Sequence, residues 1–364
     1  MPIYMDVHIV PGVKAIDVAQ AHQKDLMFQD EHTCKCMTYW VDEKRESIFC
    51  LIEAPDKNAV QEMHRKAHGL IPHKIIEVSD TLVESFLGRI YDPVDAEVTD
   101  QGLKVFSEPS FRTIMITQVT DPALIKFTLG KEKASRLLQI HTETVRRKLE
   151  EFGGKEAEHD GSGFICSFTS AAKAMSCACA IRDELTSIAD LIGFKIGINA
   201  GEPIAKNDTL FGDTIQLAQQ ICNTAKNDHV AITTTVKDLV SKDQSLNGNH
   251  ILCHTPQDEN LLQSLSLKLE EHWQNADYSV DDFAKDMAMS QSQLYRKTTE
   301  LFNLSPNLLM KEFRLEKAKE LLKKQRFSIS QITFDSGFTS PSYFTKCFKN
   351  KYGLLPMEYI DLLH

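Results

Sequence analysis

Residues 337–349 read Gly-Phe-Thr-Ser-Pro-Ser-Tyr-Phe-Thr-Lys-Cys-Phe-Lys and decide how the C-terminal part of this 364-residue chain folds. Gly337 can adopt the positive φ of a tight turn, Ser340 can cap the next helix, and Pro341 suits its first turn. At helical spacing, three phenylalanines share a buried face and leave polar and basic side chains outside. The buried residues are Phe338, Phe344 and Phe348; the outer ones are Ser342, Thr345, Lys346 and Lys349. The stretch therefore predicts a turn followed by an amphipathic helix.

A second stretch, upstream, has the same order of signals. Ser279 opens one helix, residues 287–289 make a turn, and Ser290 caps a second helix. A long amphipathic helix, predicted from residue 306 to about residue 324, follows and would join the two units rigidly. Two helix-turn-helix units in tandem indicate DNA binding, because the second helix of such a unit enters the major groove.

Several short sequence motifs occur in order along residues 261–361. They are Ser290…Leu294-Tyr295-Arg296, Leu304-Ser305-Pro306, Arg314-Leu315-Glu316-Lys317-Ala318, Leu321-Leu322, Ile329…Ile332 and Gly353…Pro356…Tyr359. Together they resemble the AraC family of bacterial transcription regulators. The resemblance implies that two recognition helices enter successive major grooves on one face of the duplex.

The resemblance also assigns DNA contacts, position by position. The side chains assigned to base edges are Ser292, Tyr295 and Arg296 of the first recognition helix, and Ser342 and Lys346 of the second. Those assigned to phosphates, which position a protein without reading sequence, are Lys297, Arg314 and Lys349. Arg296 and Lys346 carry the donors that suit guanine. For any single residue, the alternative is a solvated surface side chain.

The charge of the chain is unevenly distributed. The whole chain has 41 Lys and Arg against 51 Asp and Glu, a net charge of −10. Between Lys311 and Lys351, ten basic residues face four acidic ones, a local balance of +6. We therefore expect phosphate contacts only in this part, while the acidic remainder disfavours non-specific binding to DNA.

Composition indicates a globular protein of about two or three domains, with 42% hydrophobic and 25% charged residues. No apolar run reaches the roughly eighteen residues of a membrane span, and no signal peptide opens the chain. The nine cysteines are scattered and odd in number, which argues against a disulfide framework. We expect a cytoplasmic protein.

Two stretches rich in turn residues, 91–110 and 241–260, have no regular period and are predicted linkers. They leave three domains, at residues 1–90, 111–240 and 261–364. In the first domain the pattern alternates between strands and helices. The predicted elements are a strand at 3–10, a helix at 16–28, strands at 35–41 and 47–53, a helix from Asp56 to about His68, and a strand at 74–78. This βαββαβ order predicts a ferredoxin-like fold.

The first domain is rich in side chains that bind transition metals. They are His8, His22, His32, Cys34, Cys36, Cys50, His64, His68 and His73. His64 and His68 are four residues apart on a predicted helix, so their imidazoles share one face and can share an ion. The alternative is a polar helix surface above a cysteine that is simply buried.

Further phrases in this domain are Met5-Asp6-Val7-His8, Tyr39-Trp40-Val41-Asp42-Glu43, Cys50-Leu51-Ile52-Glu53-Ala54-Pro55 and His64-Arg65-Lys66-Ala67-His68-Gly69. They resemble a family of small bacterial ferredoxin-like proteins that bind nickel. The resemblance implies His8, Cys50, His64 and His68 as ligands. Asp6 and Glu53 are second choices, since strand alternation turns Glu53 away from Cys50.

The identity of the metal is open at this level. Nickel is the expectation from the resemblance, whereas imidazole and thiolate ligands also suit copper and zinc, which bind more tightly in general. Cys34 and Cys36 lie outside the family pattern and suit a softer ion such as Cu(I).

The middle domain contains Phe111-Arg112-Thr113-Ile114-Met115-Ile116-Thr117, Gly161-Ser162-Gly163-Phe164, Ile196-Gly197-Ile198-Asn199-Ala200-Gly201-Glu202 and Phe211-Gly212-Asp213-Thr214-Ile215. These phrases resemble the class III nucleotide cyclase domain. Such cyclases need two aspartates for divalent ions, and an asparagine and an arginine for the transition state. The corresponding positions here are Gln118, Ser162, Gln216 and Gln220. We therefore expect no catalytic residues and no enzyme activity.

Two alternatives qualify that expectation. Asp121 and Asp160 lie close to the two aspartate positions and would serve if the register were shifted. Glu158 falls where the family reads the purine, and is otherwise an exposed hairpin residue. As a dimerisation device, the domain would join two DNA-binding ends on repeated half-sites and keep a cleft for a nucleotide ligand.

The sequence thus predicts a multidomain α+β protein with a ferredoxin-like domain, a class III cyclase-like α/β domain and an all-α tandem helix-turn-helix domain. Its predicted function is a homodimeric, metal-responsive regulator that binds double-stranded DNA and no membrane. The alternatives are an active nucleotide cyclase with a DNA-binding output, and a metal buffer attached to a regulator that responds to another ligand.

Overall fold

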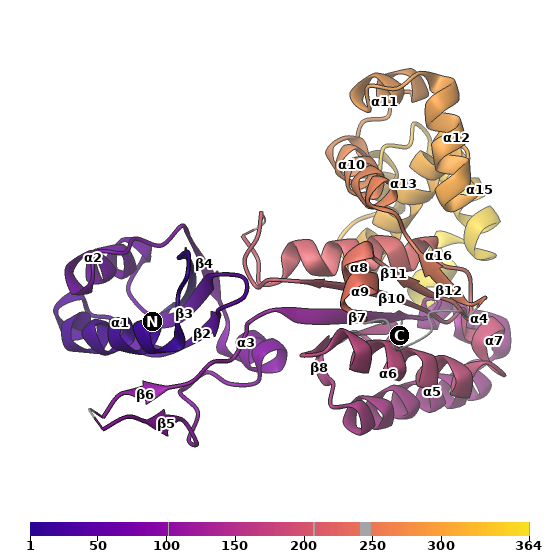
Figure 1. Ribbon diagram of the computed structural model, residues 1–364. Helices are drawn as coiled ribbons and strands as arrows, with labels where there is room; N and C mark the ends of the chain where they lie inside the picture. The colour runs from indigo at the N-terminus through magenta and orange to yellow at the C-terminus, as the bar shows by residue number, and fades with distance from the viewer. Residues whose placement is uncertain (101, 207, 241–248, 364) are drawn as a thin grey trace.

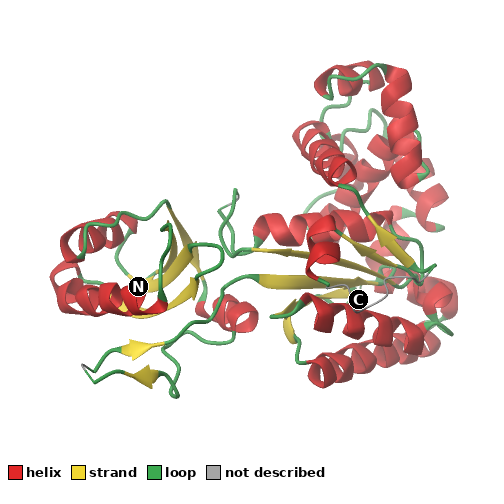
Figure 2. Cartoon of the chain, viewed as in Figure 1, coloured by secondary structure: helices red, strands yellow, loops and turns green. Residues whose placement is uncertain are grey.

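The computed structural model describes residues 1–100, 102–206, 208–240 and 249–363. Its elements form an N-terminal unit, a middle unit around a larger sheet, and a helical unit packed on one side of the middle unit (Figure 1). The mixed α/β and all-α composition of these units confirms the predicted fold class, as the colouring by secondary structure shows (Figure 2).

The N-terminal unit has the predicted βαββαβ order. Its elements are β1 (Ile3–Ile9), α1 (Ala15–Phe28), β2 (Lys35–Asp42), β3 (Ser47–Glu53), α2 (Lys57–Ala67) and β4 (Lys74–Val78), with a short 3-10 turn at Gln29–His32. The strands pair antiparallel in the order β2-β3-β1-β4. The Asp56 carboxylate accepts a hydrogen bond from Ala59 N at 2.9 Å, so it caps α2 as predicted. The ferredoxin-like prediction is confirmed.

Both faces of this four-stranded sheet are covered. One face, with Tyr4, Cys50 and Ile52, packs against α1 and α2. The opposite face packs in one continuous core with α3 (Asp80–Leu87), β7 (Arg112–Gln118) and α8 (Gly212–Thr224) of the middle unit. The contributors to this shared core from the sheet include Met5, Val7, Phe49 and Leu51. The N-terminal and middle units are therefore fused through buried apolar surface.

The predicted linker at 91–110 follows α3 and carries a small hairpin, β5 (Glu97–Val98) with β6 (Lys104–Val105). Phe106 stacks on Tyr39 of β2, with ring centroids 4.2 Å apart. In the second predicted linker, residues 241–248 lie outside the described residues. Of the remainder, β12 (Ile251–Cys253) joins the middle sheet, and α10 (Pro256–His272) begins after two intervening residues.

The middle unit is a six-stranded sheet in the order β12-β11-β10-β7-β9-β8. Its further elements are α4 (Pro122–Leu129), α5 (Lys131–Phe152), β8 (Lys155–His159), β9 (Gly163–Phe168), α6 (Ala171–Leu185), α7 (Ala189–Ile192), β10 (Lys195–Gly201), β11 (Val230–Ile232) and α9 (Thr234–Leu239). Helices α5 and α6 cover one face, and α8 covers the other (Figure 1). Helix α8 approaches β10 so closely that a Cβ on Gly197 would lie 2.3 Å from Ala218 O, which explains the glycine.

The helical unit consists of α10, α11 (Val280–Asp286), α12 (Gln291–Phe302), α13 (Pro306–Lys323), α14 (Ile329–Asp335), α15 (Pro341–Tyr352) and α16 (Pro356–Asp361). The predicted serine caps are confirmed, since Ser279, Ser290 and Ser340 each accept from a backbone N–H three residues on. Gly337 has φ +73°, as the predicted turn requires. The unit has two cores, one around α10 to α12 and one around α14 to α16, and both include residues of α13.

Candidate metal centre and nucleic-acid interface

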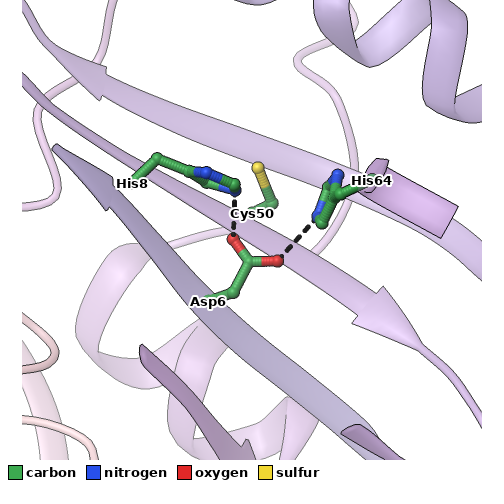
Figure 3. A group of neighbouring side chains, drawn as sticks. All are labelled: Asp6, His8, Cys50 and His64. Atoms are coloured by element: carbon green, nitrogen blue, oxygen red, sulfur yellow. Dashed lines mark hydrogen bonds and ion pairs between the residues drawn. The ribbon is translucent and has the colours of Figure 1, made fainter. Parts of the chain in front are cut away.

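The pairing of β1 with β3 brings three potential ligands to one face of the N-terminal sheet. Asp6 lies opposite Cys50 in the antiparallel register, and His8 follows two residues along β1, so all three side chains point to the same side. His64, from the buried face of α2, faces them. The ligand atoms of these four buried residues all lie within 4.8 Å of one another, and Figure 3 shows them converging.

Asp6 holds this group together. Its Oδ2 lies 2.9 Å from Nε2 of His64, and its Oδ1 lies 3.3 Å from Nε2 of His8. The three residues expose 1%, 0% and 4% of their surface, in the order Asp6, His64, His8. Figure 3 marks both contacts, with the Cys50 sulfur beside them. A carboxylate, two imidazoles and a thiol thus surround one buried point.

A second group shares His64 with the first. On its other side, Nδ1 of His64 lies 3.1 Å from Asp25 Oδ1 in α1 and 3.1 Å from Nε2 of His68. His68 Nε2 is in turn 3.2 Å from Asp25 Oδ1. The predicted ligands therefore divide: His8, Cys50 and His64 meet in the first group, while His64 and His68 meet in the second.

The structure also ranks the second choices. Asp6 lies within the first group, whereas Glu53 lies outside both groups and pairs with the amino group of Met1 at 3.4 Å. Asp25 was missed at the level of sequence. Its signal is an acid on the apolar stripe of α1, because the buried positions of that helix are Ala15, Val18, Ala19, His22 and Asp25.

The electrostatics of the two groups favour an ionised His64 between two carboxylates. Burial alone would lower the pKa of His64, but Asp6 and Asp25 outweigh it and raise this pKa to about 10. Burial would likewise raise the pKa of Asp6, yet His64 and His8 hold it well below its usual range. Burial, reinforced by Asp6, raises the pKa of the Cys50 thiol well above its ordinary value. Without a metal, the proton on His64 balances the buried carboxylates.

The remaining histidines and cysteines of this unit belong to neither group. Cys36 Sγ is 3.6 Å from Met63 Sδ in the core, and burial raises the pKa of Cys34 to about 11. The His22 ring packs on Tyr39, and His73 Nδ1 accepts from the backbone N–H of Ile9 at 3.2 Å. Cys36, His22 and His73 therefore have packing or hydrogen-bond partners of their own.

The helices predicted to read DNA present their outer faces to solvent. On α12, the predicted Ser292, Tyr295 and Arg296 are exposed, Lys297 is half-buried and 3.6 Å from Glu300, and Leu294 packs inward. On α15, the predicted contacts are exposed opposite a buried aromatic face. These exposed residues are Ser342, Lys346 and Lys349. Both sets of predicted base-edge side chains are accessible to a duplex.

Arg314, which was predicted to contact a phosphate, has hydrogen-bond partners within the protein. Its Nε donates to Trp273 O at 3.0 Å and its Nη2 donates to Asn275 O at 2.6 Å, beside the close approach of Gly337. Burial lowers the pKa of this guanidinium. Its donors thus satisfy backbone carbonyls of the loop between α10 and α11, which gives Arg314 a structural role within the helical unit.

The four cyclase-related positions have varied surroundings. Gln118 Oε1 accepts from Gln219 Nε2 at 3.2 Å, and Ser162 Oγ is 2.7 Å from Asp160 in the β8–β9 turn. Gln216 is exposed, whereas Gln220 is buried and neither of its amide atoms has a hydrogen-bond partner among the described residues. Glu158 is exposed on β8.

Among the helices that the structure describes, none combines the length and apolar character needed to cross a bilayer.

Two parts of the chain match known protein families. Residues 4–78 match the family described as nickel responsive protein SCO4226-like, and residues 283–361 match a helix-turn-helix domain family. The transcriptional regulator MtrA of Neisseria gonorrhoeae is 32% identical over 99 residues, which are 27% of this chain and 31% of MtrA. The chain spans about a third or less of such relatives, and 7% of a histidine kinase P4 from Formosa agariphila.

Solved structures also align with parts of the chain. SCO4226 from Streptomyces coelicolor A3(2) is 35% identical, covers 21% of this chain and 94% of its own length, and gives a TM-score of 0.20. The guanylyl cyclase Cya2 is 19% identical, with 38% and 82% covered and a TM-score of 0.33. The family matches confirm that the chain carries an SCO4226-like domain and an AraC-type helix-turn-helix domain.

Proposed function

We propose that this protein is a metal-responsive transcription regulator that binds double-stranded DNA through α12 and α15. One observation carries the proposal: a single chain holds a buried group of transition-metal ligands and two exposed recognition helices. The family matches at residues 4–78 and 283–361 support the same two roles.

The first ligand group, Asp6, His8, Cys50 and His64, fits a transition metal. Two imidazoles, a thiolate and a carboxylate provide the nitrogen, sulfur and oxygen donors that Ni²⁺, Cu²⁺ and Zn²⁺ accept. We propose nickel as the effector, because the matching family is described as nickel responsive. The ion would take the place of the proton on His64 and that on Cys50, so binding would release protons.

A regulator needs a route between its two sites, and the packing offers one. The metal ligands on β1 and β3 alternate with Val7, Phe49 and Leu51, which belong to the same hydrophobic core as residues of β7 and α8. Helix α8 in turn packs through Leu217 and Ile221 against the helical unit. A metal that binds one arrangement of these units more tightly than another would shift DNA affinity.

The predicted base contacts on DNA are Ser292, Tyr295, Arg296, Ser342 and Lys346, with Lys297 and Lys349 on phosphates. We also propose that the protein acts as a homodimer in the cytoplasm and binds repeated half-sites; sedimentation velocity of the full chain tests the dimer. A nucleotide ligand of the middle unit would appear as a thermal shift with GTP or cyclic nucleotides.

We propose that the middle unit is not an active cyclase. Glutamines at positions 118, 216 and 220 and a serine at 162 lack the charges that phosphoryl chemistry needs. Of the aspartates that a shifted register would use, Asp121 is engaged by two lysines and a tyrosine, and Asp160 by the turn around Ser162. Cyclic nucleotide formation from ATP or GTP with Mg²⁺ or Mn²⁺ would refute this part.

The deciding experiment compares DNA affinity with and without metal. Duplexes enriched by the full chain from a random pool are titrated with chelated protein and with Ni²⁺-, Cu²⁺- or Zn²⁺-loaded protein at matched salt. We expect different affinities in the two states for the wild type, and equal affinities for His64→Ala. Equal affinities in the wild type, with metal bound, would instead favour the metal buffer.

A further inference from the structure

A buried aspartate joins the middle unit to the second half of the helical unit. Asp121 follows β7, and its Oδ1 accepts from Ala123 N at 3.0 Å to cap α4. Its Oδ2 accepts from the Tyr359 hydroxyl of α16 at 2.9 Å. The same oxygen lies 2.8 Å from Nζ of Lys323 and 3.7 Å from Nζ of Lys319, both on α13. The side chain is only 3% exposed, so a nearly fully buried carboxylate contacts both units.

Apolar contacts surround this polar joint. Ala123 and Leu124 of α4 belong to the same core as Leu322 of α13 and the phenylalanines of α15. A helix of the middle unit thus completes the core of the second helix-turn-helix half. Separation of the two units would expose this apolar surface and leave Asp121 without three of its partners.

The joint lies two contacts away from the second recognition helix. Tyr359, which donates to Asp121, packs edge-on against Phe348, with ring centroids 5.9 Å apart. Phe348 is on the buried face of α15, whose outer face carries Lys346 and Lys349. Because packed side chains leave little free space, a shift of the Tyr359 ring would displace Phe348 and with it α15, the helix that is proposed to read DNA.

The first helix-turn-helix half contacts the middle unit at a separate site, through α10. Helix α10 follows β12 after two residues, and Glu259 of α10 accepts from Thr234 N at 2.6 Å. Leu262 packs with Leu217 and Ile221 of α8. The middle unit therefore holds each half of the helical unit at its own site, and α13 connects the two halves.

We propose that Asp121 is a positioning residue for α15, through which the middle unit fixes the separation of the two recognition helices. The chain would then accept only a narrow range of spacings between the two halves of its DNA site, because spacing mirrors protein geometry. This inference rests on the proposed function, since it takes duplex DNA as the ligand.

The test uses the full chain and the duplex that the wild type enriches. One or two base pairs are inserted between the two footprinted halves of that duplex. The variants are Asp121→Asn, which keeps an oxygen to cap α4, and Tyr359→Phe with Lys323→Ala, which keeps the ring packing. The matched control is Lys324→Ala, because Lys324 is an exposed neighbour without an ion pair among the described residues.

We expect the wild type and the control to lose about tenfold or more in affinity upon insertion, and the variants to lose about threefold or less. Amide hydrogen exchange should be faster in α16 of the variants than in the control. An insertion penalty equal to that of the wild type, or unchanged exchange in both variants, would overturn the inference while leaving DNA binding intact. Failure of the wild type to enrich any duplex would overturn the proposed function and this inference with it.

Discussion

The His64 imidazole lies between two carboxylates, 2.9 Å from Asp6 on one side and 3.1 Å from Asp25 on the other. Because its pKa is raised to about 10, the ring is protonated on both nitrogens and positively charged at neutral pH in the absence of metal. The charged ring is thus a structural element of the metal-free N-terminal unit as well as a candidate ligand.

Replacement of His64 with alanine should destabilise the metal-free N-terminal unit by about 3 kcal/mol, because two buried carboxylates lose their counter-charge. Trp40, which is fully buried in this unit, reports the transition when the second tryptophan is removed by Trp273→Phe. Urea denaturation followed by Trp40 fluorescence measures the change. His229→Ala, in the middle unit, is the control, and equal midpoints in both variants would contradict this role.

His141 should make the stability of the middle unit depend on pH. It lies between Phe164 and Phe194, and burial lowers its pKa to about 4. An unfolded histidine titrates near 6.5, so stability is complete above that pH and is lost as pH falls toward 4. At pH 5 the loss is about 2 kcal/mol.

Calorimetry of wild type and His141→Leu between pH 7.5 and 5 tests this dependence. The melting temperature of the wild type should fall more steeply than that of the variant. His229→Leu replaces a histidine whose ring lies 2.8 Å from Asn227 O, and should behave as the wild type. Parallel slopes for His141→Leu and the wild type would show that His141 is not the titrating group.

Arg296 and Lys349 should affect DNA binding differently. Loss of Arg296, a predicted base contact, should cost about 1–3 kcal/mol and relax selectivity at one base pair. Loss of Lys349, a predicted phosphate contact, should weaken binding to all sequences alike and reduce the slope of log affinity against log salt by about 1. Binding isotherms of the two alanine variants across salt concentrations distinguish these effects. An exposed lysine on α5, Lys133, provides the control.

Arg314→Lys should lower stability without changing the salt slope. Lysine cannot reach both Trp273 O and Asn275 O, so at least one carbonyl loses a charged donor, at a cost of about 1–3 kcal/mol. Thermal unfolding and DNA titrations of the same variant measure both quantities. An unchanged melting temperature would contradict this structural role. Because lysine keeps the positive charge, a parallel Arg314→Met variant tests the phosphate contact, which would reduce the salt slope by about 1.

The candidate metal centre was predictable only in part. Helical spacing places His64 and His68 together, and strand alternation turns Glu53 away from Cys50. The contact between Asp6 and Cys50 depends on the antiparallel register of β1 with β3, which no local pattern specifies. Asp25 comes from a third element, so its place beside His64 depends on the packing of α1 on α2.

The helical unit was more predictable, because serine caps, a turn glycine and an apolar period are local signals. Arg314 shows the limit of such signals. A basic side chain has the same local pattern whether it binds a phosphate or a backbone carbonyl, and only the position of Asn275 decides. The role of Asp121 was likewise not predictable from local signals, because its partners are distant in the sequence, on α13 and α16.

The core shared by the N-terminal sheet and the middle unit also bears on synthesis of the chain. Met5, Val7, Phe49 and Leu51 leave the ribosome soon before α3 but well before β7 and α8, which complete the same core. At a synthesis rate of about 5–20 residues per second, this face of the sheet would stay exposed for on the order of ten seconds. The nascent N-terminal unit therefore passes through a stage in which one side of its sheet is open to chaperones or to neighbouring chains.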